Sequence, residues 1–244
     1  MKNLEIYIHI PFCVRKCEYC DFLSFPADDD AKLRYVKGLM AEMIFYGPLM
    51  KNYQVSSVYI GGGTPSSIDE QWIAALMEGV FDCFNVLPDA EISIECNPGT
   101  LSREKLLVYR DAGINRLSIG LQSANNDELK LLGRIHTFEQ FVTNYEVARN
   151  VGFKNINVDL MYGLPEQSAS QYMATVNKII RLHPDHISAY SLIVEKGTPF
   201  YEKYKFDMVR QEAGMRTEFL PNEGELYDME KAGQKAFMDA GYRQ

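Results

Sequence analysis

The chain has 244 residues, of which 46% are hydrophobic and 24% are charged, as is usual for a globular domain. This composition excludes a disordered chain, a collagen and a coiled coil, and the length allows one large domain. The formal net charge of −8 argues against nucleic acid or an anionic membrane surface as the main partner.

We expect no membrane-spanning segment, since no apolar run approaches 18 residues, and no signal peptide, since the N-terminus from Met1 to Ile6 lacks the apolar core of one. We therefore expect a cytoplasmic protein that is not integral to a membrane. Three of the five cysteines, Cys13, Cys17 and Cys20, are crowded into one short segment. This spacing is the reverse of a secreted disulfide framework and predicts a metal centre in a reducing compartment.

Short segments rich in β-branched residues alternate with helical patterns along the chain. This alternation predicts an α/β fold with a parallel sheet. One helical stripe runs from Ile73 to Phe84 through Leu76, Met77, Val80 and Phe81, and another runs from Phe138 to Tyr145. Gly113 and Gly152 each lie between a predicted helix and the next predicted strand, where a residue in the left-handed conformation commonly ends the helix. The strands are expected at residues 4–10, 55–60, 90–95, 116–120, 155–160 and 186–191.

The pattern weakens from Gly197, and a last amphipathic helix contains Leu226, Met229 and Phe237. The chain then stops without the strand that a continuing alternation would place next. We expect one domain over residues 1–244, with a βα core at 1–200 and the start of a C-terminal extension, cut short, at 201–244.

The cysteine triplet has the spacing C-x3-C-x2-C directly after the first strand. Three thiolates can hold a 4Fe–4S cluster and leave one iron without a protein ligand, so that a small molecule can coordinate there. The alternatives are three thiols without a metal, or a zinc site completed by a histidine or by Cys83 or Cys96.

Polar and glycine residues follow other predicted strands, at the edge where ligands of parallel βα folds bind. The run Gly61-Gly62-Gly63-Thr64-Pro65 lets backbone approach a ligand closely, although a plain turn would also explain it. Glu95 closes the third strand, where a carboxylate can bind an ammonium group or hydroxyls. Alternation along the first strand places Tyr7 and His9 on one face.

These segments together resemble the radical S-adenosylmethionine (SAM) superfamily, whose signature is this cysteine spacing with an aromatic residue, here Tyr19, before the third cysteine. Within it, the chain resembles the oxygen-independent coproporphyrinogen III oxidase group. The sequence Cys20-Asp21-Phe22 resembles the heme chaperone (HemW) branch, because the oxidase branch has a further cysteine where Phe22 stands. The motifs that carry the resemblance are Tyr7–Cys13, Gly61–Pro65, Glu95–Pro98, Gly120–Ser123, Leu132–His136 and Asp159–Pro165.

The resemblance implies a partial TIM-like βα barrel of about six βα units, a 4Fe–4S cluster held by Cys13, Cys17 and Cys20, and SAM as a second cofactor. In the oxidase branch, the positions of Gln122, Arg134 and Asp159 line a second SAM site. The expected cofactor-binding residues are Tyr7, Tyr19, Gly62, Gly63, Thr64, Glu95, Gln122, Arg134, Asp159 and Ser191.

The resemblance also implies a heme chaperone, with oxidative decarboxylation of a porphyrinogen as the alternative function. The expected partners are a tetrapyrrole, a reducing electron donor and, in a homodimer, a second copy of the chain. The resemblance implies heme as a third cofactor, and the family's heme-binding region is expected past residue 244. The resemblance implies SAM cleavage by the chain, whereas Phe22, which replaces the additional cysteine, disfavours porphyrinogen oxidation.

Overall fold

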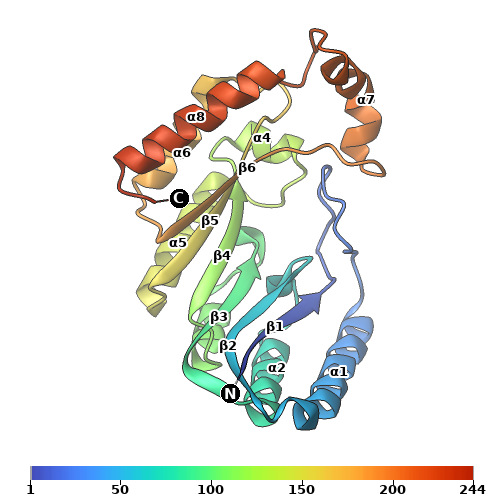
Figure 1. Ribbon diagram of the computed structural model, residues 1–244, viewed down its shortest axis with the longest axis vertical. Helices are drawn as coiled ribbons and strands as arrows, with labels where there is room; N and C mark the ends of the chain where they lie inside the picture. The colour runs from blue at the N-terminus through green and yellow to red at the C-terminus, as the bar shows by residue number, and fades with distance from the viewer. Residues whose placement is uncertain (1, 244) are drawn as a thin grey trace. The chain divides into compact units, whose positions relative to one another are not determined.

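The computed structural model describes residues 2–243 and confirms the predicted α/β class. Its six strands form one sheet in the order β1-β2-β3-β4-β5-β6, and a helix follows each strand along the chain (Figure 1). Every predicted strand is present, and most are a few residues longer than expected. The strands are β1 Lys2–Ile10, β2 Tyr53–Gly62, β3 Val86–Cys96, β4 Arg116–Gln122, β5 Asn155–Tyr162 and β6 His186–Ser191.

Most of the helices begin at a side chain that accepts a hydrogen bond from the first turn, as N-cap residues do. Ser168 and Asn222 go further and form capping boxes with Gln171 and Glu225. The helices are α1 Asp29–Tyr46, α2 Glu70–Cys83, α3 Arg103–Asp111, α4 Asn126–Leu131, α5 Phe138–Val151, α6 Ala169–Ile180, α7 Pro199–Glu212 and α8 Glu223–Asp239, with short 3₁₀ turns at η1 Gly47–Met50, η2 Pro65–Ser67 and η3 Pro98–Thr100.

The chain divides into two compact units. The first comprises the residues up to Lys16 together with Phe22–Ile119 and Val142–Ile156. The second comprises Cys17–Asp21, Gly120–Phe141 and the residues from Asn157 on.

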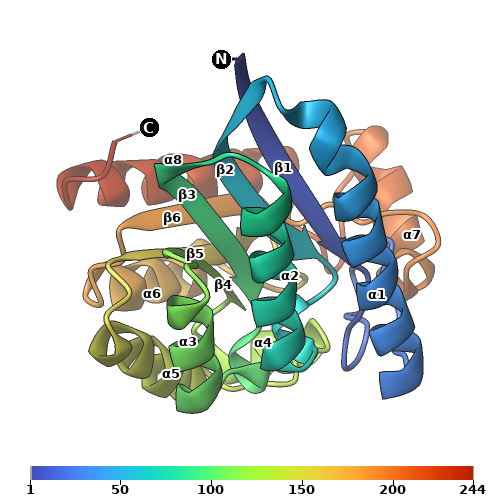
Figure 2. The same cartoon turned by 90° about the horizontal axis from the view of Figure 1, so that it is seen from below.

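In the first unit, α1 and α2 pack beside each other along β1, β2 and β3 (Figure 2). The α2 residues Ile73, Leu76, Met77 and Val80 are fully buried, as the helical stripe predicted. The prediction was wrong for Phe81, which is 46% exposed. A Cβ built on Gly113 would come within 3.1 Å of the Phe81 ring.

Gly113 and Gly152 have φ angles of +89° and +112°, which confirms the left-handed conformation predicted for both. Gly113 follows α3 and Gly152 follows α5, so each of these glycines turns the chain from a helix toward the next strand.

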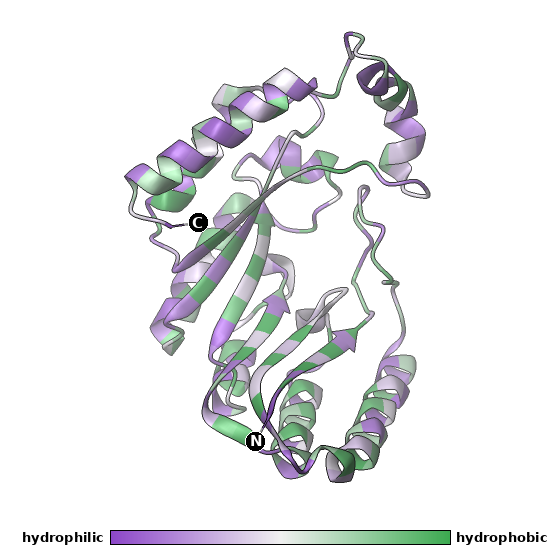
Figure 3. Cartoon of the chain, in the orientation of Figure 1, coloured by the Kyte–Doolittle hydropathy of each residue, from purple (hydrophilic) through white to green (hydrophobic). Residues whose placement is uncertain are grey.

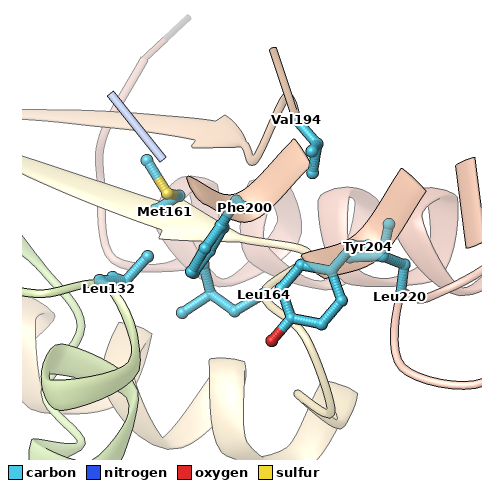
Figure 4. Packing of buried hydrophobic residues seen from close by; sticks show 7 residues of the cluster. All are labelled: Leu132, Met161, Leu164, Val194, Phe200, Tyr204 and Leu220. Carbon is cyan, nitrogen blue, oxygen red and sulfur yellow. The ribbon is translucent and has the colours of Figure 1, made fainter. Parts of the chain in front are cut away.

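In the second unit, β5 and β6 pair in parallel from Asn157 and His186 to Tyr162 and Ser191. The helix α7, which the weak pattern after Gly197 did not predict, contributes Phe200 and Tyr204 to a buried cluster (Figure 4). The other members of this cluster are Leu132, Met161, Leu164, Val194 and Leu220.

A second cluster of this unit joins α6 to α8, the amphipathic helix that the sequence predicted. Tyr162, Tyr172, Val176 and Met229 form its buried part. Figure 3 shows hydrophobic and hydrophilic residues alternating along α8, as expected of a helix with one packed face. None of the helices within residues 2–243 has the length and apolarity that crossing a membrane requires.

Candidate functional site

The glycine run of the first unit is fixed to the backbone that leads into the cysteine segment. Gly63 N donates to Ile10 O at 2.8 Å, and Thr64 N donates to Phe12 O at 2.7 Å. The Cys13 Sγ and Thr64 Oγ1 atoms are 3.4 Å apart, within hydrogen-bonding distance for sulfur. A Cβ on Gly63 would lie 2.8 Å from Phe12 O and 3.1 Å from Cys13 Sγ. Only glycine therefore permits this close approach.

Glu95 is held by two donors from β2. Its Oε2 accepts from Gly62 N at 3.0 Å, and its Oε1 accepts from the Tyr59 hydroxyl at 2.8 Å. The Tyr59 ring stacks on Tyr7, with centroids 6.2 Å apart. Tyr7 is 58% exposed, and partial desolvation, with a contribution from the negative charge of Glu95, raises the pKa of Tyr7. Predicted ligand-binding residues from β1, β2 and β3 thus meet within this unit.

In the second unit, the segment Cys17–Asp21 is anchored by backbone hydrogen bonds. Glu18 N donates to Leu132 O at 3.1 Å, and Glu18 O accepts from Phe200 N at 3.0 Å. The Tyr19 ring packs 6.4 Å from that of Phe200. Burial raises the pKa of Tyr19, although the nearby Arg134 cation opposes this. Tyr19 therefore lies against the hydrophobic cluster of α7.

Arg134 lies beside the same segment. Its Nη1 donates to Cys17 Sγ at 3.6 Å and its Nη2 donates to Gly120 O at 2.6 Å. Burial alone would lower the pKa of Arg134, but Tyr19 and Cys17 outweigh it, so the net shift is upward and the cation is retained. Its Nε is buried and has no hydrogen-bond partner among residues 2–243. An orphaned guanidinium nitrogen suits an anionic ligand.

We expect Arg134→Met to lower the free energy of unfolding by about 1–3 kcal/mol, because Gly120 O would lose its donor in a partly buried setting. Urea unfolding of the metal-free protein measures this change. Lys130 is an exposed cation on α4. The free energy of unfolding of Lys130→Met should therefore stay within about 0.5 kcal/mol of that of the parent. Equal effects of the two substitutions would contradict the role given to Arg134.

The remaining predicted residues lie at or near the ends of β4, β5 and β6. Gln122 is buried, with its Oε1 accepting from the Tyr190 hydroxyl at 3.0 Å. Asp159 Oδ1 accepts from Asn157 Nδ2 at 2.7 Å. Ser191 ends β6 opposite Tyr162 of β5. The structure thus groups Gln122 with Tyr190, whereas Asp159 contacts Asn157 of β5 and pairs with Ser188 of β6.

The cysteine side chains have the chemistry that a metal centre at Cys13, Cys17 and Cys20 requires. All five cysteines are thiols rather than disulfides, and no group of three His, Cys, Asp or Glu side chains within residues 2–243 is already arranged around a metal position. Cys13, Cys17 and Cys20 are half-buried, and Cys13 and Cys17 each have a polar neighbour. Burial raises the pKa of Cys96, which disfavours the thiolate that metals bind. The donor chemistry fits a thiolate-ligated cluster at the triplet.

Sequence reasoning missed the two tyrosines that orient the predicted ligand-binding residues. Tyr59 lies two residues before the glycine run, and Tyr190 lies beside the predicted Ser191. Strand alternation was the available signal, because it places Tyr59 on the same face as Tyr7 and Gly61. No sequence signal indicated that α7 anchors the segment Cys17–Asp21.

Six parallel strands in sequential order, with polar residues and glycines at their carboxyl ends, define a protein of the partial TIM-like βα barrel class. The family model of the Radical SAM superfamily matches residues 7–179. The chain therefore belongs to the radical SAM superfamily.

Curated relatives and solved structures agree with this assignment. Heme chaperone HemW of Escherichia coli (strain K12) is 36% identical over 247 residues, covering 99% of this chain and 61% of that protein. Heme chaperone HemW of Bacillus subtilis (strain 168) is 40% identical over 196 residues, covering 80% of this chain and 52% of that protein. The chain thus spans about three fifths or less of the length of these relatives.

A solved structure with the same fold is coproporphyrinogen III oxidase (HemN) from Escherichia coli, described as a radical SAM enzyme. It aligns with a TM-score of 0.86 at 29% identity, over 99% of this chain and 54% of that one. Streptococcus suis SuiB bound to S-adenosylmethionine aligns with a TM-score of 0.65 at 16% identity, over 98% of this chain and 49% of that one. The second likeness bears on the fold alone.

Proposed function

We propose that the chain binds a 4Fe–4S cluster through Cys13, Cys17 and Cys20, binds SAM beside it, and serves as a HemW-like heme chaperone. The observation that carries the cofactor part is Arg134, a cation beside Cys17 whose buried Nε has no partner among the described residues. The proposal keeps residues 1–244 as one radical SAM core and a reducing, cytoplasmic setting, in which cysteines remain thiols.

The chain's own residues would bind and orient the cofactors. When bound and reduced, the cluster supplies one electron for breaking a carbon–sulfur bond of SAM. Gly62, Gly63 and Thr64 present backbone at close range to the methionine part of SAM, and Glu95 offers a carboxylate to its ammonium or hydroxyl groups. Arg134 and Gln122 would offer donors to its anionic or polar groups. Asp159, Ser191, Tyr7 and Tyr19 complete the proposed set, with Tyr19 supporting the cysteine segment.

The heme part of the proposal rests on the relatives and on Phe22. The similar proteins of Escherichia coli and Bacillus subtilis are heme chaperones by name, and Phe22 stands where the oxidase branch has a further cysteine. The partners proposed are a tetrapyrrole and an electron donor. Oxidation of coproporphyrinogen III is the second candidate, supported by the likeness to HemN.

The test is anaerobic reconstitution followed by iron and sulfide analysis. We expect about four irons per chain, as a 4Fe–4S cluster requires, and almost none in the variant with Cys13, Cys17 and Cys20 all changed to Ala. Cys83→Ala is the matched control and should keep the full iron content. Zinc in place of iron, or iron that survives the triple substitution, would overturn the cofactor assignment.

The same preparations separate the two candidate activities. Dithionite and SAM should give 5′-deoxyadenosine with the parent chain and not with the triple variant. Added heme should give a stable bound absorption spectrum if the chaperone function belongs to this part of the protein. Anaerobic consumption of coproporphyrinogen III with SAM would instead support the oxidase.

A further inference from the structure

The second unit contains a buried carboxyl group that none of the roles above uses. Glu128 of α4 is only 6% exposed. Its Oε2 accepts from the Ser123 hydroxyl and, at 3.1 Å, from Gln167 Nε2. Its Oε1 is buried without a hydrogen-bond partner among residues 2–243. Burial raises the pKa of Glu128, with both hydrogen bonds opposing the shift.

This carboxyl group links two loops that follow neighbouring strands of the chain. Ser123 comes directly after β4, and Gln167 belongs to the loop after β5, where its Oε1 also accepts from Leu164 N at 3.3 Å. Thr175 of α6 supports the same link, because its Oγ1 accepts from Ala124 N at 3.2 Å. The segment after β4 is thus fastened by α4, by the β5 loop and by α6.

The residue next to this link is Gln122, which has a φ angle of +75°. A non-glycine residue adopts this left-handed conformation at a cost in conformational free energy. It keeps the conformation only where contacts with its surroundings hold the backbone in place. Gln122 is 5% exposed, and its Oε1 accepts from Tyr190. Its Nε2 is therefore the donor that it can offer to a ligand.

A buried carboxyl group that has hydrogen bonds to only one of its oxygens contributes little to stability. An apolar side chain of similar size would avoid the free-energy cost of desolvating the carboxyl group. Its hydrogen bonds do, however, fix one geometry. Glu128 also lies in the first turn of α4, where a negative charge favours the helix dipole, but Asp127 occupies the same turn and is exposed. The helix dipole alone therefore does not explain why the Glu128 carboxyl group is buried.

We propose that Glu128 is a positioning residue, which holds Gln122 in its left-handed conformation so that the Gln122 amide meets SAM. The inference rests on the proposed function for its ligand and on the contacts of Ser123, Gln167 and Thr175 for its mechanism. Glu128 itself touches no cofactor.

The test compares Glu128→Gln, which keeps both acceptor contacts, with Glu128→Leu, which removes them. Hydrogen–deuterium exchange of the metal-free protein measures directly how well the backbone amides of this segment are protected. In Glu128→Leu, the amides of Ala124 and Asn125 should exchange at least about tenfold faster, whereas Glu128→Gln and the control Asp127→Leu should match the parent. Unchanged exchange in Glu128→Leu would overturn the proposal, whatever the protein binds.

A double-mutant cycle on the reconstituted protein measures whether Glu128 and Gln122 act together in SAM binding. We expect Glu128→Leu to weaken SAM binding about tenfold and Glu128→Gln to restore it to within about twofold. In a Gln122→Ala background, Glu128→Leu should cause almost no further loss. Additive losses would overturn the assignment. If the parent chain itself bound no SAM, the proposed function would fail, and the exchange experiment would still decide whether Glu128 holds this segment.

Discussion

Gly62→Ala should destabilise the protein by about 3 kcal/mol or more, because two unfavourable effects add at this position. Gly62 has a φ of +118°, which L side chains rarely adopt, and a Cβ there would lie 2.6 Å from the His9 ring. The substitution also disturbs the amide that donates to Glu95, so SAM affinity should fall with stability. Urea unfolding and SAM titration measure the two losses.

Gly38→Ala is the matched control for this prediction. Gly38 lies within α1, and a Cβ there meets nothing within 4 Å. Alanine should therefore stabilise the helix by about 0.5–1 kcal/mol. A Gly62→Ala protein as stable as its parent would show that the backbone at the end of β2 is less constrained than the structure indicates.

His136 should make the protein sensitive to acid. Burial, and then the neighbouring Arg134 cation, lower the pKa of His136 to about 3, against about 6.5 in an unfolded chain. The side chain is 4% exposed and is neutral in the folded protein, so below pH 6.5 the unfolded state binds the extra proton. Between pH 7.5 and pH 4.5 this group should remove about 2.7 kcal/mol of stability.

The measurement is urea unfolding at both pH values, for the parent and for His136→Gln. Glutamine keeps a donor for Leu121 O, which His136 Nε2 contacts at 3.3 Å, but it does not titrate. The variant should therefore lose about 2.7 kcal/mol less than the parent on acidification. An identical loss in His136→Gln would show that other groups cause the acid sensitivity.

The strands and most helices were predictable because their signals are local. β-branched runs located all six strands, and the glycines after α3 and α5 marked helix ends. The glycine run and Glu95 could be associated through the rule that parallel sheets bind ligands at their carboxyl edge. The structure adds the hydrogen bond from Gly62 to Glu95.

Long-range contacts account for what the sequence could not predict. The helix α7 has a weak periodicity, since Phe206 and Val209 are exposed while Asp207 is buried. Asp207 is buried because it accepts from the backbone amides of Glu218, Phe219 and Leu220, and no local pattern predicts such a carboxylate. The roles of Tyr59, Tyr190 and Glu128 likewise depend on partners from other strands or loops.

The anchoring of Cys17–Asp21 has a consequence for the order of folding. Cys17 and Arg134 are 117 residues apart in sequence, and Phe200, which binds Glu18 O, follows later still. At a synthesis rate of about 5–20 residues per second, this segment leaves the ribosome on the order of ten seconds before its partners. During that interval Cys17 and Cys20 lie on a segment of the nascent chain that has no folded partner, where oxidants and metal ions can reach the thiols. Cluster insertion after α7 has folded would therefore meet a more ordered set of thiols than insertion during synthesis.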